Sequence, residues 1–404
     1  MNRFVFSPAD ILLPAAADMQ KWSVVACDQF SSEPEYWDRV NSFVGDAPST
    51  LRLITPEAYL DRVSAEEESQ RISGVMREYL DGGIFKEYKD SFVYVERTQL
   101  DGSIRRGLVG KIDLEEYDYT PGSGKAVAAS EKTVVSRLPV RIEIRKNALI
   151  ELPHIMVFFS DPEKTAFEML CSKKDGLAKV YDFELMENGG NIKGWIVGGK
   201  DAEEVTAALA SCGGSTKLVI GDGNHSLAAA KEYWNSIKKT LGADEIENHP
   251  ARFALAEINN VYDDSIQFEP IHRVVFDSDP DKLLGSIKAR FGTNGEVRVP
   301  YVTAAGRGEI TLPKMRFGDV IGTLQGHLED FTAENGGTID YIHGDNAAES
   351  MGKGAGCIAF LLPKMGKDEL FATVAEGRVF PKKSFSVGLA PEKRYYLECR
   401  KIVK

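Results

Sequence analysis

The chain has 404 residues, a mass of 44.5 kDa and a formal net charge of −12, which allows two domains or one elaborated α/β body. Its 43% hydrophobic and 27% charged residues are typical of a globular protein, and no apolar run reaches the ~20 residues of a membrane span, so we expect no membrane partner. The acidic balance disfavours a nucleic-acid partner, because a phosphate backbone requires a concentrated basic face.

The N-terminal segment and the cysteines indicate a cytoplasmic protein. Pro8, Asp10 and Pro14 interrupt the first residues, so this segment lacks the unbroken apolar core of a signal peptide. The five cysteines lie far apart and include no Cys-x-x-Cys pair, which argues against a disulfide framework and a zinc knuckle. We therefore expect a small-molecule substrate as the partner, and the sequence leaves the oligomeric state open.

The N-terminal part of the chain alternates short strands with helices. Proline at position 34 suits the first turn of a helix over 33–43, and Gly82-Gly83 ends a predicted helix over 56–80. Asp101-Gly102 between two β-branched runs is typical of a hairpin turn. The predicted strands of this part lie at 11–14, 23–26, 91–99 and 104–112.

Arginines recur every four residues at Arg137, Arg141 and Arg145. This spacing aligns side chains on one face of a helix, although Pro139 breaks or kinks a helix that contains all three. Two interpretations remain open: a basic stripe that faces a ligand, or a salt-bridged surface element.

The next segments give a simple pattern of elements. An apolar run predicts a strand over 155–159, and 202–210 predicts a helix. The glycine-rich stretches 189–199 and 350–356 predict loops.

The most informative segment is Lys217-Leu-Val-Ile-Gly-Asp-Gly-Asn-His-Ser226. Its first four residues predict a buried strand, while Gly221 and Gly223 permit a tight turn and a close approach of ligand to backbone. Apolar residues spaced three and four apart then predict a helix, with Asn224 or Ser226 as its cap. Because a helix start carries free N–H groups and the positive end of the dipole, this junction favours an anion such as phosphate.

Four polar side chains surround this turn, namely Asp222, Asn224, His225 and Ser226. They supply a carboxylate, an amide, an imidazole and a hydroxyl within a few residues. A ligand site, a metal site and an ordinary turn whose polar groups only cap the helix are the three interpretations, and the density of reactive groups favours the ligand site.

A second candidate site follows downstream. Residues 252–258 and 266–276 predict paired strands joined across Asp263-Asp264, and the second strand carries His272 and Arg273. A lone histidine in a strand is more often structural than catalytic, so the functional interpretation competes with a structural one.

The C-terminal part holds a third polar cluster at 381–388, followed by a strand-like segment over 393–402. Within the cluster, Lys383 and Ser384 are groups that bind phosphate, although exposed lysines need no such role.

Fold class follows from the alternation of elements. Short strands that alternate with helices, together with the hairpin, predict an α/β or α+β fold with a mixed sheet and flanking helices. Asp277-Ser-Asp-Pro280 interrupts the pattern. We therefore predict a main α/β domain over 1–275 that carries the glycine turn, and a C-terminal α/β region over 276–404 whose tail returns to the site.

Several separated motifs occur together, namely Glu131-Lys-Thr133 with Arg137, Gly221-Asp-Gly-Asn-His-Ser226, Glu269-Pro-Ile-His-Arg-Val-Val275, Tyr341-Ile-His-Gly344, Pro381-Lys-Lys-Ser-Phe-Ser386 and Lys393-Arg-Tyr-Tyr396. In these motifs and their order, the chain resembles the bacterial and archaeal family called domain of unknown function 1015. The glycine turn of that family is similar to the phosphate-contacting turn of the ParB/sulfiredoxin-like superfamily, which includes sulfiredoxin, ParB nucleotidases and free-serine kinases.

The resemblance implies a ParB/sulfiredoxin-like element around the turn and a nucleotide phosphate near residues 221–226. It also implies a carboxylate that deprotonates a substrate hydroxyl, and by this analogy the segment Cys27-Asp-Gln29 approaches the site with Asp28 or Glu33 as the base.

One departure from the family pattern bears on phosphate binding. Many members carry Asp-Gly-His-His-Arg where this chain has Asp222-Gly-Asn-His-Ser226. The arginine that grips phosphate is therefore missing, and its charge has to come from Arg273, Lys383 or the Arg137 stripe.

Together these observations predict a nucleotide-dependent phosphotransferase that acts on a small hydroxyl compound, with a free amino acid as one candidate acceptor and ATP or ADP with Mg²⁺ as cofactor. The predicted catalytic residues are Asp222, His225 and Asp28, with Asp222 also holding Mg²⁺. The predicted phosphate-binding residues are Gly221, Gly223, Asn224, Ser226, His272, Arg273, Lys383 and Ser384. The alternatives are a non-catalytic sensor of a phosphorylated small molecule, and a metal-dependent hydrolase using Asp222, His225 and His272.

Overall fold

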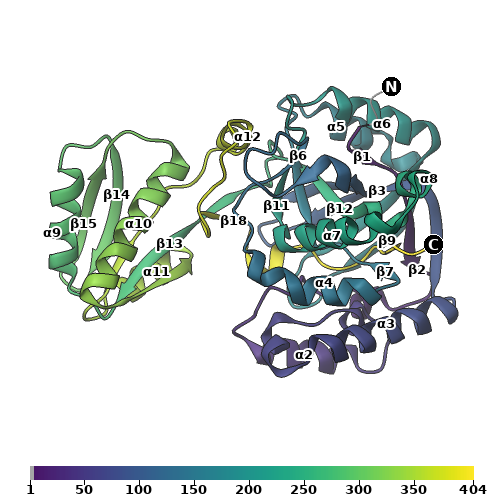
Figure 1. Cartoon of the computed structure of the whole chain (residues 1–404), viewed down its shortest axis with the longest axis horizontal. Helices are drawn as coiled ribbons and strands as arrows, with labels where there is room; N and C mark the ends of the chain where they lie inside the picture. The colour runs from purple at the N-terminus through teal and green to yellow at the C-terminus, as the bar shows by residue number, and fades with distance from the viewer. Residues whose placement is uncertain (1–3) are drawn as a thin grey trace. The chain divides into compact units, whose positions relative to one another are not determined.

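The computed structural model describes residues 4–404, which form two compact units (Figure 1). The first unit extends to Ile266 and also contains Leu389–Lys404, and the second comprises Gln267–Gly388. The division falls before β13 (Phe268–Phe276), whereas the sequence pattern changes after that strand.

The first unit is built on a mixed sheet. Its main path has the order β5-β6-β11-β8-β12-β4-β3-β10-β9, with β1 paired to β4 and β2 to β3. The pairs β5–β6, β6–β11 and β8–β12 are parallel, and the others are antiparallel. The strands are β1 (Phe6–Ser7), β2 (Ala9–Pro14), β3 (Phe85–Thr98), β4 (Ile104–Asp113), β5 (Tyr117–Asp118), β6 (Val127–Ala129), β8 (Met156–Phe159), β9 (Ala178–Glu184), β10 (Asn191–Gly198), β11 (Leu218–Asp222) and β12 (Phe253–Asn260).

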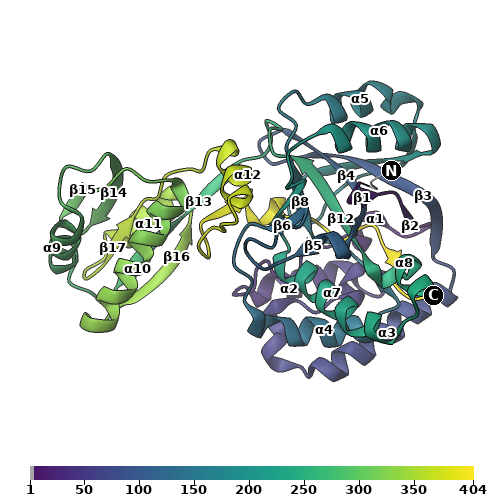
Figure 2. The same ribbon diagram turned by 45° about the horizontal axis from the view of Figure 1, so that its top comes forward.

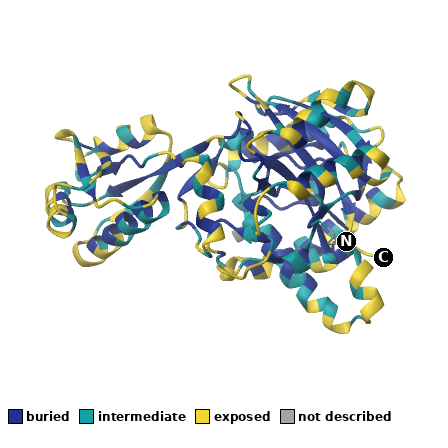
Figure 3. Ribbon diagram, turned by 90° about the horizontal axis from the view of Figure 1, so that it is seen from above, coloured by how far each residue is buried: buried dark blue, intermediate teal, exposed yellow. Residues whose placement is uncertain are grey.

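Helices cover this sheet. Figure 2 shows α5 and α6 on one side of the unit and α2, α3, α4 and α7 on the other. The helices are α1 (Met19–Trp22), α2 (Pro34–Val44), α3 (Ala65–Asp81), α4 (Leu138–Asn147), α5 (Thr165–Lys173), α6 (Gly199–Ser211), α7 (Asn224–Ile237) and α8 (Ala243–Asn248). The core forms where apolar helix faces meet the strands, as at Val205 of α6, Leu227 of α7 and Ile220 of β11. Figure 3 shows the buried strands in dark blue and the outer helix faces in yellow.

The second unit has an antiparallel sheet of the order β15-β14-β17-β13-β16, and β18 pairs with the first residues of β13. Its strands are β13, β14 (Val297–Thr303), β15 (Gly306–Leu312), β16 (Thr338–His343), β17 (Ile358–Phe360) and β18 (Phe385–Val387). Its helices are α9 (Pro280–Phe291), α10 (Phe317–Asn335), α11 (Asp345–Gly352) and α12 (Lys367–Ala375). The predicted mixed sheet with flanking helices is thus confirmed.

Several local predictions need correction. The helix expected over 56–80 begins only at Ala65, because Ser64 caps it by accepting a hydrogen bond from the Glu67 N–H; a short 3₁₀ turn precedes it. Residues 23–26 form only one bridge, between Val25 and Tyr395.

Two further corrections concern strand pairing. The strands expected to pair across Asp263-Asp264 lie in different sheets, because β12 pairs with β4 and β8 whereas β13 pairs within the second unit. The stretch 189–199 is mostly the strand β10 rather than a loop. Gly194 faces the ring of Tyr181, where a Cβ atom would lie 2.1 Å from the ring, so glycine permits this packing.

No helix within residues 4–404 has the length and apolar character needed to span a lipid bilayer.

Buried ion pairs bind the C-terminal segment Leu389–Lys404 to the rest of the first unit. The guanidinium of Arg394 pairs with Glu257 and Glu398, and its Nε donates to the Pro153 carbonyl at 3.1 Å. All three charged side chains are at most 3% exposed. Within this segment only β19 (Arg400–Lys401) is a regular strand, and it pairs with β7 (Ile150–Glu151). The predicted strand over 393–402 is therefore mostly irregular chain.

We expect Arg394→Met to lower the free energy of unfolding by about 3–5 kcal/mol, because it leaves two carboxylates buried without their cation. Urea denaturation measures the change. The control is Lys401→Gln, which removes an exposed cation 3.9 Å from Glu87 and should change stability by at most about 0.5 kcal/mol. Equal effects of the two substitutions would contradict a fastening role for Arg394.

Candidate functional site

The glycine turn has the predicted strand–turn–helix form. β11 ends at Asp222, α7 begins at Asn224, and Gly223 between them has φ 76° and ψ 24°, in the left-handed region. A Cβ atom at Gly223 would lie 2.9 Å from the Ile155 Cα, and one at Gly221 would lie 2.3 Å from the Phe158 ring. Both glycines are therefore needed, one for its backbone conformation and both for close packing.

The start of α7 has open backbone donors. The N–H groups of Ser226 and Leu227 donate to the Gly223 carbonyl, whereas those of Asn224 and His225 bond to no residue in the described part of the chain. No side chain caps the helix, so the predicted cap at Asn224 or Ser226 is wrong. The Asn224 amide instead donates to the Glu131 carbonyl and the Thr133 hydroxyl, at 3.3 and 3.1 Å. The anion-binding geometry of a helix start is retained.

A buried ion pair lies at this turn. The Asp222 Oδ1 accepts the Gly223 N–H at 2.9 Å, and its Oδ2 lies 3.2 Å from the Lys393 Nζ. The two side chains are 19% and 9% exposed, so solvent screens the pair weakly. Lys393 comes from the C-terminal segment and supplies positive charge beside the helix start.

Asp28 lies in the same electrostatic environment. Burial acts to raise the pKa of Asp28, but attraction to His154, a hydrogen bond from the Gln29 amide and the charge of Lys393 outweigh it and hold this pKa below its usual range. Asp28 is therefore a carboxylate at neutral pH and can accept a hydrogen bond or a proton.

His225 is neutral at physiological pH. Its Nε2 accepts the Val134 N–H at 3.2 Å, and burial together with Arg141 and Arg137 lowers its pKa to about 4. The hydrogen bond assigns the ring proton to Nδ1. His225 thus acts as a neutral donor. Of the cations near the turn, Lys393 and Arg141 are paired with carboxylates, and Arg137 has no such partner among the described residues.

The arginines predicted to form a basic stripe lie on and just before the short helix α4. Pro139 lies in the first turn of α4 rather than inside it, so the helix carries Arg141 and Arg145 but begins after Arg137. Arg141 pairs with Glu57 and Arg145 with Glu151, whereas Arg137 is exposed and forms no ion pair with a described residue. The salt-bridged interpretation therefore fits two of the three arginines.

A chain of polar groups borders the turn on its other side. The Ser226 hydroxyl lies 3.2 Å from the His154 Nε2, and the His154 Nδ1 lies 3.0 Å from the Tyr396 hydroxyl. That hydroxyl also accepts the Cys27 N–H at 3.2 Å. Burial and the neighbouring Asp28 raise the pKa of the Cys27 thiol to about 11, so this thiol is unreactive at neutral pH.

The second candidate site lies in the second unit and holds that unit together. The His272 Nδ1 accepts the Leu362 N–H at 3.0 Å, and its Nε2 lies 2.8 Å from the Asp345 carboxylate. Arg273 is fully buried and donates to the Gln325 side chain and to the carbonyls of Ile271, Lys382 and Lys383. These contacts suit structural roles. Phosphate binding by His272, Arg273, Lys383 and Ser384 stays a prediction.

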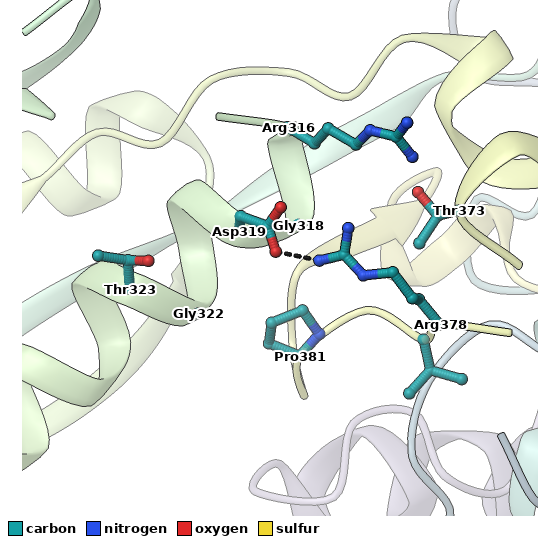
Figure 4. Close-up of a pocket in the computed structure, with 9 residues that line it drawn as sticks. Arg316, Gly318, Asp319, Gly322, Thr323, Thr373, Arg378 and Pro381 are labelled. Carbon is teal, nitrogen blue, oxygen red and sulfur yellow. Dashed lines mark hydrogen bonds and ion pairs between the residues drawn. The ribbon is translucent and has the colours of Figure 1, made fainter. Parts of the chain in front are cut away.

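A cavity of ≈250 Å³ also lies in the second unit, at the start of α10 (Figure 4). Arg378 pairs with Asp319 there, and Arg316 pairs with Glu376. The paired charges cancel, and none of the four residues predicted to bind phosphate in this unit lines the cavity. It therefore has no excess positive charge for a phosphate.

The sequence predicts that Asp222 holds Mg²⁺. Within residues 4–404, no group of three or more His, Cys, Asp or Glu side chains is placed to hold a metal ion. Because the His225 Nε2 already accepts the Val134 N–H, its use as a transition-metal ligand in a hydrolase is disfavoured.

Sequence reasoning missed His154, Tyr396 and Lys393 as site residues. Tyr396 and Lys393 lie in a family motif, which was the available signal, but nothing local to Lys393 links it to Asp222. His154 follows a proline before a strand and carries no pattern of its own.

A sequence model of the family described as "Protein of unknown function (DUF1015)" matches residues 9–401, so the chain belongs to this family. No curated protein matches the chain.

Among solved structures, the chain resembles a free serine kinase in complex with AMP, at 13% identity, TM-score 0.39 and coverage of 72% of this chain and 91% of that chain. A variant of a free serine kinase in complex with ADP gives 14% identity, TM-score 0.39 and the same coverages. A conserved hypothetical protein from Pyrococcus furiosus gives 13% identity, TM-score 0.35 and coverage of 69% and 90%. Likenesses this distant assign no activity.

We expect Gly223→Ala to destabilise the protein by about 2–3 kcal/mol, because alanine disfavours the left-handed conformation and its Cβ meets the Ile155 backbone. Chemical denaturation checks this value. Gly74 offers a matched control in the interior of α3, with nothing within 4 Å of a Cβ atom. Gly74→Ala should stabilise by about 0.5–1 kcal/mol. A neutral effect at Gly223 would mean that the turn rearranges freely.

We expect His225 to make stability depend on pH. Its folded pKa of about 4 lies below the unfolded value of 6.5, so the unfolded state takes up the proton first as pH falls. The contribution of His225 to the free energy of unfolding is complete above about pH 6.5. About 2–3 kcal/mol of it is lost as the pH falls towards 4. The measurement compares urea denaturation of the wild type and His225→Gln at pH 7.5 and 4.5. The wild type should lose more stability, and parallel losses would assign the pH dependence elsewhere.

Proposed function

We propose that this protein is a nucleotide-dependent phosphotransferase that binds phosphate at the start of α7 and transfers it to a small hydroxyl compound. The observation that carries the proposal is the pair of open N–H groups at Asn224 and His225, with Lys393 and Arg137 beside them. Helix N–H groups together with a cation that no described carboxylate neutralises, here Arg137, are what a nucleotide phosphate requires. Phosphoryl transfer otherwise needs positioning and charge stabilisation rather than a covalent intermediate.

Each residue of the turn has a defined task in this proposal. Gly221 and Gly223 let the phosphate approach the backbone, and the Nδ1–H of His225 donates a hydrogen bond to it. Lys393 balances negative charge that develops on the transferred group, in place of the arginine that other family members carry in the turn. Asp222 holds Lys393 in position through their ion pair.

Asp28 is the proposed base. The acceptor oxygen forms its bond to the terminal phosphorus as the bond from that phosphorus to the nucleotide oxygen breaks. The hydroxyl proton moves to the Asp28 carboxylate, and the nucleotide leaves with one phosphate fewer. A carboxylate of low pKa is a weak base, which is sufficient where the transition state is loose and the proton moves late.

ATP or ADP is the proposed donor, with Mg²⁺. Asp222 would hold the ion, and one or two carboxylates are the usual protein contribution to Mg²⁺ bound with phosphates. The bound ion would neutralise phosphate charge. The nucleotides named for the free serine kinase structures, AMP and ADP, and serine as an acceptor, are the first compounds to test alongside ATP.

The decisive test is Asp28→Asn, assayed for transfer of phosphate from ATP and ADP to a panel of amino acids and sugars. Loss of the base should lower kcat by about 10²–10⁴-fold while the nucleotide Kd changes less than about threefold. Asp46→Asn is the control, because Asp46 is an exposed turn residue outside the site. Glu33→Gln tests the other carboxylate near this segment, and a loss confined to it would move the base to Glu33.

Two results would overturn the phosphotransferase. Tight nucleotide binding without turnover on any acceptor would favour a sensor of a phosphorylated small molecule. Absence of nucleotide binding would remove both functions.

A further inference from the structure

A second cavity lies in the first unit beside the glycine turn. It has a volume of ≈170 Å³ and is bordered by residues of α3, α4 and α7 and of the segment 53–57. Most of the lining is aliphatic, including Leu53, Ile54, Ile72, Met76, Ile144 and Leu152. An apolar cavity of about 150 Å³ accepts a benzene molecule, so this one has room for a compact group of about six or seven carbon atoms.

The polar end of the same cavity belongs to the proposed active site. Ser226, His154 and Tyr396 all line it, and they are the members of the hydrogen-bonded chain beside the turn. Ser226 is in the first turn of α7, whose open N–H groups are the proposed phosphate site. Cys27, which precedes the proposed base, also contributes to the lining. One end of the cavity therefore offers hydrogen bonds next to the phosphate, and most of the remaining lining is aliphatic.

The charged residues of the lining do not call for a charged ligand. Arg141 is paired with Glu57, and Arg145 with Glu151. These charges cancel in pairs, so the cavity presents no net charge to its occupant. Sugars and other compounds with hydroxyls on every side would leave polar groups against aliphatic walls without partners.

We infer that this cavity binds the apolar body of the phosphate acceptor. The acceptor class is then a hydroxyl compound with a compact branched aliphatic or aromatic group, and its hydroxyl lies at the Ser226–His154 end. The inference rests on the proposed phosphotransferase function and narrows its substrate class. Each methylene that the cavity buries should raise kcat/KM for the acceptor about fourfold.

The test uses Val140, which lines the cavity and is 38% exposed. Val140→Phe narrows the cavity from the surface without disturbing the buried core. Val135→Phe is the matched control, because Val135 is a 61% exposed valine of the neighbouring 3₁₀ turn outside the lining. The acceptors are two pairs, serine with α-isopropylserine and ethanol with 3-methylbutan-1-ol. Both members of each pair carry a primary hydroxyl, and they differ in the branched group.

We expect the branched member of each pair to have at least a tenfold higher kcat/KM. Val140→Phe should remove that advantage without changing the nucleotide Kd, and Val135→Phe should keep it. Turnover that favours serine, or an advantage that survives Val140→Phe, would overturn the apolar acceptor and leave the phosphotransferase standing.

A binding measurement separates the two proposals. Without nucleotide, 3-methylbutan-1-ol should raise the Tm of the wild type and of Val135→Phe but not of Val140→Phe. This pattern together with absent turnover would refute the phosphotransferase while retaining an apolar ligand in the cavity. The lack of any shift in the wild type would overturn the cavity assignment itself.

Discussion

The ion pair between Asp222 and Lys393 connects the two parts of the chain that build the site. Asp222 ends a central strand and shapes the turn through its bond to the Gly223 N–H, whereas Lys393 lies on the C-terminal segment. Because the pair is largely shielded from solvent, removing either residue would leave the other charge poorly solvated. The turn, the open helix start and the nearby carboxylate Asp28 therefore share one electrostatic arrangement.

That arrangement depends on a second layer of buried charge. Arg394, next to Lys393, pairs with Glu257 and Glu398. Burial acts to raise the pKa of Glu257, but the charges of Arg394 and Arg105 outweigh this effect and hold that pKa low. A segment with little regular secondary structure is thus placed by side-chain ion pairs together with isolated backbone bridges, those of Tyr395 with Val25 and of Cys399 with Leu12. This explains how an irregular tail can position a lysine at a turn.

Much of the fold was predictable, because it depends on local patterns. The hairpin at Asp101-Gly102 and the strand–turn–helix around Gly223 follow from turn chemistry and hydrophobic spacing. Pairing was less predictable: β12 and β13 look like neighbours in the sequence, yet their partners lie in different sheets. Gly194 of β10 looked like a loop residue, because the Tyr181 ring that it accommodates lies on another strand.

The candidate site was predictable only at its centre. Residues 221–226 carry their own signal, but the contacts of Asp222 and Ser226 with Lys393 and His154 join distant parts of the chain. The cap was wrongly predicted for the same reason, since the Asn224 amide is used by the distant residues Glu131 and Thr133. Only three-dimensional contact decides between a capping role and such partners.

The second unit is inserted between Ile266 and Leu389 of the first, and this order has a consequence for biosynthesis. A ribosome releases the strand, the turn and α7 long before it releases Lys393 and Arg394. At about 5–20 residues per second, the interval between Asp222 and Lys393 lasts roughly ten to thirty seconds. Throughout it, Asp222 lacks Lys393, and Glu257, once translated, lacks Arg394. The nascent first unit therefore completes its charge balance only once Lys393 and Arg394 have been translated, so a chain terminated before them lacks the site even though it contains the whole glycine turn.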